Sequence, residues 1–145
     1  MRGLIQRVST ASVYANGTMR GRIGNGLVLF LAVEDGDTEQ TADKLLHKVL
    51  RYRVFEDQSG RMNNSLLDCH GGLIVVSQFT LAANTRKGLR PSFTEAAHPN
   101  EGRLLYEYFA IQAAKQLPEV VTGVFGADMM VDLKNRGPAT FLLSV

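Results

Sequence analysis

Two apolar runs stand out in the hydropathy pattern of the chain, residues 27–33 (LVLFLAV) and residues 73–76 (LIVV). Runs of this length that are rich in β-branched residues are typical of strands buried on both faces. The second run continues as SQFTL, so the pattern predicts one strand over residues 73–81. Its end carries Ser77, Gln78 and Thr80, whose side chains both donate and accept hydrogen bonds, and this concentration of polar groups marks a candidate site.

Weaker alternation predicts further strands. Residues 4–13 alternate loosely between apolar and polar side chains, and Asn16-Gly17 follows as a hairpin signal because both turn positions need positive φ. We therefore expect residues 11–14 to pair with residues 19–23. The remaining expected strands are residues 120–122, 129–134 and 139–145, the last two separated by a turn at residues 135–138.

Apolar residues at helical spacing predict two amphipathic helices. The first spans about residues 38–53, with Asp37 as the expected N-cap because Gln40 follows it at the spacing of a capping box. The second begins at Pro99 and ends before Pro118. Because no linker or repeat divides the chain, we expect one α/β domain over residues 1–145, a mixed, barrel-like β-sheet covered by the two helices.

Composition narrows the class of protein. The 145 residues are 45% hydrophobic and 21% charged, as in ordinary globular proteins, and no window approaches the ~18 apolar residues of a membrane span. A lone Cys69 cannot form an internal disulfide, which favours a cytoplasmic protein. One cysteine and three histidines argue against a structural zinc site, and no cofactor is expected. A formal net charge of +2 identifies no partner by itself.

The Ser77–Thr80 segment offers hydrogen-bond donors but no general base. No His, Lys or carboxylate lies within five residues on either side, and the three histidines lie in segments that the pattern predicts to be exposed. Thr80 would need a base in order to act as a nucleophile. The segment therefore suits a site that orients a substrate and stabilises an oxyanion. The alternative is a strand end whose hydroxyls only satisfy backbone groups.

Two further motifs carry possible chemistry. Gly137-Pro138 precedes a predicted strand, where a cis peptide bond would direct carbonyl oxygens rigidly one way, although a plain hairpin turn is the alternative. The loop after the candidate site holds three cations, Arg86, Lys87 and Arg90. Such a loop is either a phosphate-binding segment or a solvated surface loop.

The motifs together resemble those of the D-aminoacyl-tRNA deacylase family. SQFTL is followed by TRKG-x-RPSF, then VFGADM, then N-x-GP-x-T, and the segments MRGLIQRVSTASV, IGNGLVLFLAVEDGDT and RVFEDQSGRMNNSLLD agree as well. The resemblance covers essentially the whole chain, with Ala139 at a position where Val is common. It implies a homodimeric cytoplasmic hydrolase that cleaves the ester joining a D-amino acid to the terminal adenosine of tRNA, a step of chiral proofreading.

The resemblance also assigns roles to residues. It places the catalytic segment at Ser77, Gln78, Phe79 and Thr80, and it implies that Gly137-Pro138 is cis and projects into the other subunit's site. Carbonyls there would reject L-aminoacyl groups by steric clash, while glycine would escape this gate. We favour hydrolysis assisted by the substrate's ribose hydroxyl, with main-chain N–H groups near Phe79 and Thr80 as oxyanion donors and the Gln78 amide in support. A nucleophilic Thr80 is the competing mechanism.

For the tRNA, Arg86, Lys87 and Arg90 are the expected phosphate contacts. Phe125 and Met129 are expected walls of the pocket for the terminal adenosine, because stacking on such side chains holds single-stranded ends; plain core residues are the alternative. Two other functions remain open, a tRNA- or DNA-binding dimer without catalysis and a purely structural dimer. The modest net charge and the lack of a basic stripe argue against the binding module.

Overall fold

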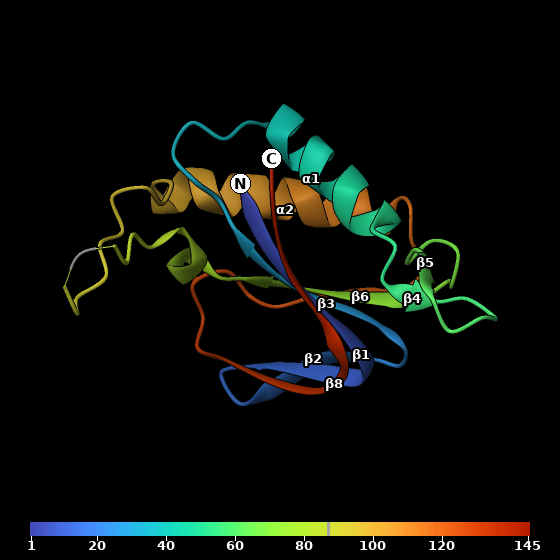
Figure 1. The fold of residues 1–145 in the computed structure, drawn as a ribbon. Coiled ribbons are helices and arrows are strands. Elements are labelled where there is room, and N and C mark those ends of the chain that lie inside the picture. Colours follow the sequence, from blue (N-terminus) through green and yellow to red (C-terminus); the bar gives the residue numbers. More distant parts are fainter. Residues whose placement is uncertain (87) are drawn as a thin grey trace.

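The computed structural model of the chain describes residues 1–86 and 88–145, and its centre is a mixed β-sheet (Figure 1). β1 is antiparallel to β2, β3 and β8, whereas β3 pairs with β6, and β6 with β7, in parallel. The strands of the sheet are β1 (Arg2–Ala15), β2 (Thr18–Ile23), β3 (Gly26–Ala32), β6 (Gly72–Ser77), β7 (Val120–Thr122) and β8 (Met129–Ser144). A separate small hairpin is formed by β4 (Phe55–Glu56) and β5 (Met62–Asn64).

Both helices, α1 (Glu39–Arg51) and α2 (Pro99–Ala114), lie on one face of the sheet (Figure 1). The apolar face of α1 packs there in a core cluster with strand residues such as Leu29 and Val75. The other face of the sheet curls around a second cluster that includes Val28 and Ile74. The curl brings β2 close to β7, so that a Cβ on Gly21 would meet the Val121 side chain at 2.7 Å. The predicted fold, a barrel-like α/β sheet with two helices, is confirmed.

The start of α1 differs from the sequence prediction. Thr38, and not Asp37, is the N-cap, and it forms a capping box with Thr41. The Asp37 carboxylate instead accepts hydrogen bonds from the amino group of Met1 and from the Glu34 N–H, each at 2.7 Å. An ammonium charge is a stronger partner for a carboxylate than a neutral N–H, so the neighbouring hydroxyl caps the helix.

The strand predicted over residues 73–81 ends earlier, at Ser77. The parallel ladder between β3 and β6 stops at the pair Leu31–Ser77, after which the Gln78 N–H donates to the Leu31 carbonyl at 2.8 Å. With no strand left to pair with, residues Phe79–Ala82 fold into a short 3-10 helix, η1. The polar segment therefore lies on a strand-to-helix corner and not on a strand.

The turn predicted at residues 135–138 is also absent, because β8 runs as one strand from Met129 to Ser144. It pairs with β1 along almost its full length, and the register shifts opposite Gln6–Val8. Gly137-Pro138 lies at this irregularity, and its peptide bond is cis. A proline, which has no N–H to donate, is accommodated where the ladder is interrupted. The hairpin at Asn16-Gly17 is confirmed, with φ of 49° and 77°.

Candidate active site

Two cavities meet at the corner that follows β6. The first, the sheet cavity, has a volume of about 520 Å³, and the second, the helix cavity, of about 280 Å³. Both are lined by Ser77, Gln78, Phe79, Phe125 and Gly126. The sheet cavity adds Phe30, Val76, Ala127, Met129 and Val131, and the helix cavity adds Leu31, Val33, Ala96, Ala97, Pro99, Gly102 and Tyr106.

The corner presents both main-chain and side-chain donors. Phe79 and Thr80 are the first residues of η1, and the N–H groups that begin a helix have no acceptor within it. The Gln78 Nε2 donates to the Thr80 Oγ1 at 2.6 Å, so this amide and hydroxyl hold one another in place. Phe79 is 58% exposed and packs against Phe93, with ring centroids 5.1 Å apart. Thr80 adjoins the cavities through Gln78 but does not line them.

Phe125 forms the wall between the two cavities, and Tyr106 helps to fix it. The two rings lie 5.9 Å apart, and the Tyr106 hydroxyl donates to the Val75 carbonyl at 2.9 Å. Burial raises the pKa of Tyr106 to about 12, so this hydroxyl remains a donor throughout the physiological range. A Cβ on Gly102 would lie 3.4 Å from the Phe125 ring, so glycine leaves the ring room against α2.

Neither cavity is lined by an ordinary general base. Among the residues that the structure describes, no His, Lys, Asp or Glu lines either cavity, although His98 lies between two lining residues of the helix cavity, Ala97 and Pro99. The same described ranges contain no group of three residues suited to hold a metal ion. What the site presents is a set of hydrogen-bond donors between two largely apolar walls. Such a site can orient a reactive ester and stabilise an oxyanion.

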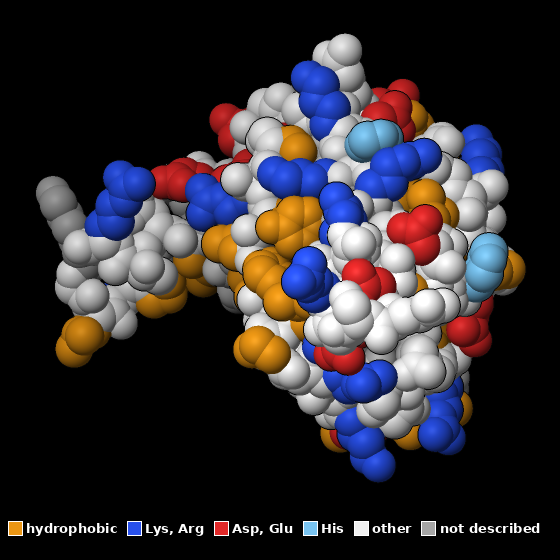
Figure 2. Space-filling model, turned by 45° about the vertical axis from the view of Figure 1, so that its right-hand side comes forward, with side chains coloured by type: hydrophobic (Ala, Val, Ile, Leu, Met, Phe, Trp, Pro, Cys, Tyr) orange, Lys and Arg blue, Asp and Glu red, His pale blue; other side chains and the backbone are white. Residues whose placement is uncertain are grey.

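The basic loop projects from the body of the protein beside this corner (Figures 1 and 2). Its base is closed by two backbone hydrogen bonds between Asn84 and Ser92, of 2.8 and 3.1 Å. The Asn84 amide also donates to Glu95, and its carbonyl oxygen accepts from the Arg86 N–H. The side chains of Arg86 and Arg90 are exposed, whereas Lys87 lies outside the described residues.

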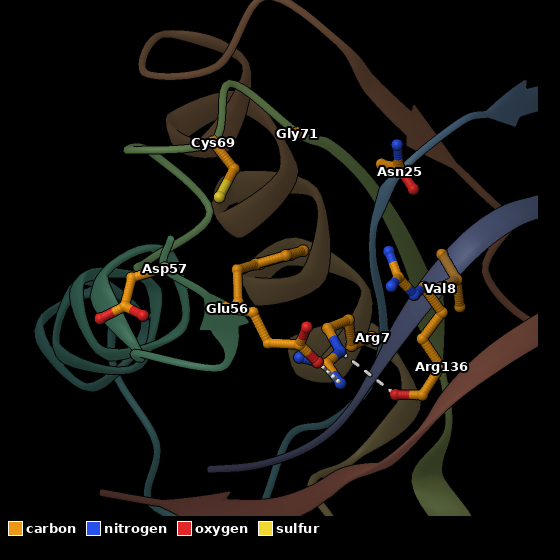
Figure 3. Close-up of a pocket in the computed structure, with 9 residues that line it drawn as sticks. Arg7, Val8, Asn25, Glu56, Asp57, Cys69, Gly71 and Arg136 are labelled. Atoms are coloured by element: carbon orange, nitrogen blue, oxygen red, sulfur yellow. Dashed lines mark hydrogen bonds and ion pairs between the residues drawn. The ribbon is translucent and has the colours of Figure 1, made fainter. Parts of the chain in front are cut away.

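Gly137 and Pro138 are exposed, and neither lines the sheet cavity or the helix cavity of its own chain. The main chain just before them is held by Arg7, whose Nε donates to the Arg136 carbonyl at 3.1 Å. Figure 3 shows this contact at one side of a separate cavity of about 400 Å³.

Arg7 is a structural residue that the sequence reasoning missed. It is only 5% exposed, and its Nη1 donates to the Val54 carbonyl at 2.6 Å while Nη2 pairs with Glu56 at 3.4 Å. One signal was available, because Arg7 shares a strand face with the fully buried Ile5 two residues earlier. A charged side chain at a position that the strand alternation places in the core indicates a buried hydrogen-bonding or ionic partner.

The fold and the corner define a small α/β protein with a hydrogen-bonding site between two cavities. Residues 4–144 match the D-Tyr-tRNA(Tyr) deacylase family, and the chain belongs to this family. Deacylases are hydrolases, so the prediction of a hydrolytic enzyme is confirmed.

Individual proteins are similar to this chain over its full length. The chain is 57% identical over 145 residues to a D-aminoacyl-tRNA deacylase of Aeromonas hydrophila, covering 100% of both proteins. A solved structure named c-Myc DNA unwinding element binding protein is 34% identical, with a TM-score of 0.94 over 100% of this chain and 99% of that one. A probable eukaryotic D-amino acid tRNA deacylase, 16% identical, shares the fold with a TM-score of 0.86 over 99% of this chain and 98% of that one. No helix in the described part of the chain is long and apolar enough to cross a membrane.

Proposed function

We propose that the chain hydrolyses the ester between a D-amino acid and the 3′-terminal adenosine of tRNA, in the cytoplasm, as a chiral proofreading step of translation. The observation that carries this proposal is the meeting of two cavities at Gln78 and Phe79. An aminoacylated adenosine has two bulky ends joined by an ester. If this ligand spans both cavities, its ester lies beside the hydrogen-bond donors of the corner. Phe125 and Met129, which both line the sheet cavity, are suited as walls for such a ligand.

Stabilisation of the oxyanion is the proposed chemical contribution of the protein. The N–H groups of Phe79 and Thr80, at the start of η1, would donate to the ester oxygen as negative charge develops there. Gln78 supports the corner through its hydrogen bond to Thr80, and Ser77 adds a hydroxyl at the same junction. An aminoacyl ester is already activated, and its neighbouring ribose hydroxyl can orient the attacking water. Main-chain donors then suffice without a base from the protein.

Selection against L-amino acids is proposed to come from a second copy of the chain. Gly137 and Pro138 do not line the cavities of their own chain, so they can act as a gate only from a partner subunit. Their carbonyl oxygens would stand where an L side chain must lie. The proposal therefore requires a homodimer. Arg86, Arg90 and, outside the described residues, Lys87 would contact tRNA phosphates from the projecting loop.

Deacylation of three esters tests the activity and the gate together. D-tyrosyl-tRNA is expected to be cleaved, L-tyrosyl-tRNA to remain intact, and glycyl-tRNA to be cleaved measurably, because glycine has no side chain for the gate to reject. Release of labelled amino acid with time measures all three. Inertness of both tyrosyl esters would overturn the proposed activity. Inertness of glycyl-tRNA alone would overturn only the steric gate.

Replacement of Thr80 by Ala distinguishes the two mechanisms. If main-chain N–H groups stabilise the oxyanion, the variant is expected to keep kcat within about tenfold of the wild-type value. The Thr80 N–H remains in the variant, and only the side-chain hydrogen bond from Gln78 is lost. Loss of a true nucleophile costs far more, on the order of a thousandfold or greater. Single-turnover deacylation of D-tyrosyl-tRNA measures the difference, with Thr80→Ser as the matched control. A loss of that size in Thr80→Ala, rescued in Thr80→Ser, would establish Thr80 as the nucleophile.

A nucleic-acid-binding dimer without catalysis is the second candidate. The name of the 34% identical solved structure, a DNA unwinding element binding protein, favours it. Such a protein would bind uncharged and D-aminoacylated tRNA without releasing the amino acid. The deacylation experiment above therefore separates the two functions, because cleavage of the D-ester is expected only from the enzyme.

A further inference from the structure

A groove on the far side of Phe125 has no role in the proposed reaction. This α2 groove, of about 520 Å³, lies between α2 and the segment that follows β7. It shares Phe125 with both site cavities and Tyr106 with the helix cavity, so the three hollows meet at Phe125. The groove is lined by Tyr106, Glu107, Ala110, Ile111, Ala114, Thr122, Gly123, Val124 and Phe125.

The floor of the α2 groove is apolar and open. Ile111 is 57% exposed, although it lies beside Ala110, Ala114 and Val124. An exposed branched side chain set in such a hollow offers a flat-sided ligand a surface on which to pack. The groove could therefore hold a planar group that enters from the neighbouring cavity.

Two charges of opposite sign lie at one end of this floor. Arg103 and Glu107 are one helical turn apart, so they share a face of α2. The Arg103 guanidinium lies 5.8 Å from the centroid of the Phe125 ring, at which the groove meets the two site cavities. Both side chains are exposed, and neither forms an ion pair with any residue that the structure describes. Along α2, a cation, a carboxylate and then the apolar floor thus follow one another.

We propose that the α2 groove binds the penultimate cytidine of the tRNA 3′ end, an inference that rests on the proposed function. Every tRNA ends in CCA, so the nucleotide that continues from the bound adenosine is cytidine. Its base can pack on the apolar floor, and its N4 amino group can donate to the Glu107 carboxylate, an established pairing for cytosine. The phosphate between the two nucleotides would face Arg103. The groove thereby distinguishes a tRNA end from a free aminoacyl nucleoside.

Two substrates of different length test the groove. D-tyrosyl-adenosine fills only the site at the corner, whereas the D-tyrosyl ester of the trinucleotide CCA also reaches the groove. Arg103→Ala is expected to raise KM for the trinucleotide about threefold to tenfold and to leave D-tyrosyl-adenosine unchanged. Arg61→Ala, which removes an exposed charge that lines neither the groove nor the two site cavities, is the control and should change neither KM.

A change of base provides a readout that a structural role of Glu107 would not give. In a CUA ester, uridine presents an O4 acceptor where cytidine has a donor, so the wild type should show a KM about tenfold higher than for CCA. Glu107→Gln supplies an amide N–H that can donate to O4, and it should reduce this preference to about threefold or less. Equal KM values for CCA and CUA in the wild type would overturn the proposal.

Other outcomes are equally decisive. Loss of activity on D-tyrosyl-adenosine in Arg103→Ala would show that this residue serves the corner and not a groove nucleotide, and would also overturn the inference. Dissociation of a dimer in that variant, seen by analytical ultracentrifugation, would identify the groove as a subunit contact and would overturn it likewise. Failure of the wild type to cleave any of the esters would instead refute the proposed function.

Discussion

Replacing Arg7 by Met is expected to lower the free energy of unfolding by about 2–4 kcal/mol. Arg7 is 5% exposed, its guanidinium donates to the carbonyls of Val54 and Arg136, and methionine has no donor to replace it. Val54 is 1% exposed, so its carbonyl would be left buried without a partner. Urea denaturation at one fixed protein concentration measures the change, because the stability of any dimer depends on concentration.

Two variants make the Arg7 result specific. Arg7→Lys keeps the charge but lacks the planar guanidinium group that donates to separate acceptors. It is therefore expected to lose about half as much free energy of unfolding as Arg7→Met. Arg61→Met, at an exposed position, should stay within about 0.5 kcal/mol of the original. A fully stable Arg7→Met protein would show that water replaces the guanidinium at no cost.

Replacing Gly102 by Leu is expected to lower kcat/KM for D-tyrosyl-tRNA at least about a hundredfold, the effect of displacing a bound substrate by about 1 Å. Gly102 lines the helix cavity, and a Cβ there already comes within 3.4 Å of the Phe125 ring. The rest of a leucine side chain must push that ring aside or enter the cavity. Because Gly is the poorer helix former by about 1 kcal/mol, helix propensity favours the variant.

Gly102→Ala is the matched control for cavity blocking. It gains a similar helix propensity but adds only one methyl group, which would lie 3.4 Å from the nearest atom of the Phe125 ring. The expected decrease in kcat/KM is therefore less than about fivefold. Urea denaturation of both variants establishes that they are folded. If a folded Gly102→Leu protein keeps the wild-type kcat/KM, the helix cavity is not part of the substrate site.

The elements with a strong local pattern were predictable from the sequence. The apolar spacing of α1, the two buried parallel strands and the Asn16-Gly17 hairpin all depend on neighbours within a few residues. The convergence of Ser77, Gln78 and Phe79 with Phe125 and Met129 was predicted only through the family resemblance. No periodicity can indicate that residues about fifty positions apart line one cavity.

The errors have a common physical cause, because each depended on a distant partner. The strand at residues 73–81 ended at Ser77 since β3 offered no further ladder. The expected turn at residues 135–138 became part of β8 because β1 is long enough to pair on both sides of the interruption. Thr38 caps the helix in place of Asp37, because the Asp37 carboxylate binds the amino group of Met1.

Placing the proposed oxyanion donors in the main chain at the start of η1 has an evolutionary consequence. A backbone N–H is encoded by no particular codon, and any side chain that preserves the corner preserves the donor. The walls around it can therefore diverge to suit different amino acids or different RNA ends, while the reaction is inherited with the fold. Mutations are then expected to abolish activity chiefly by collapsing or filling the cavities, and only rarely by deleting a reactive group.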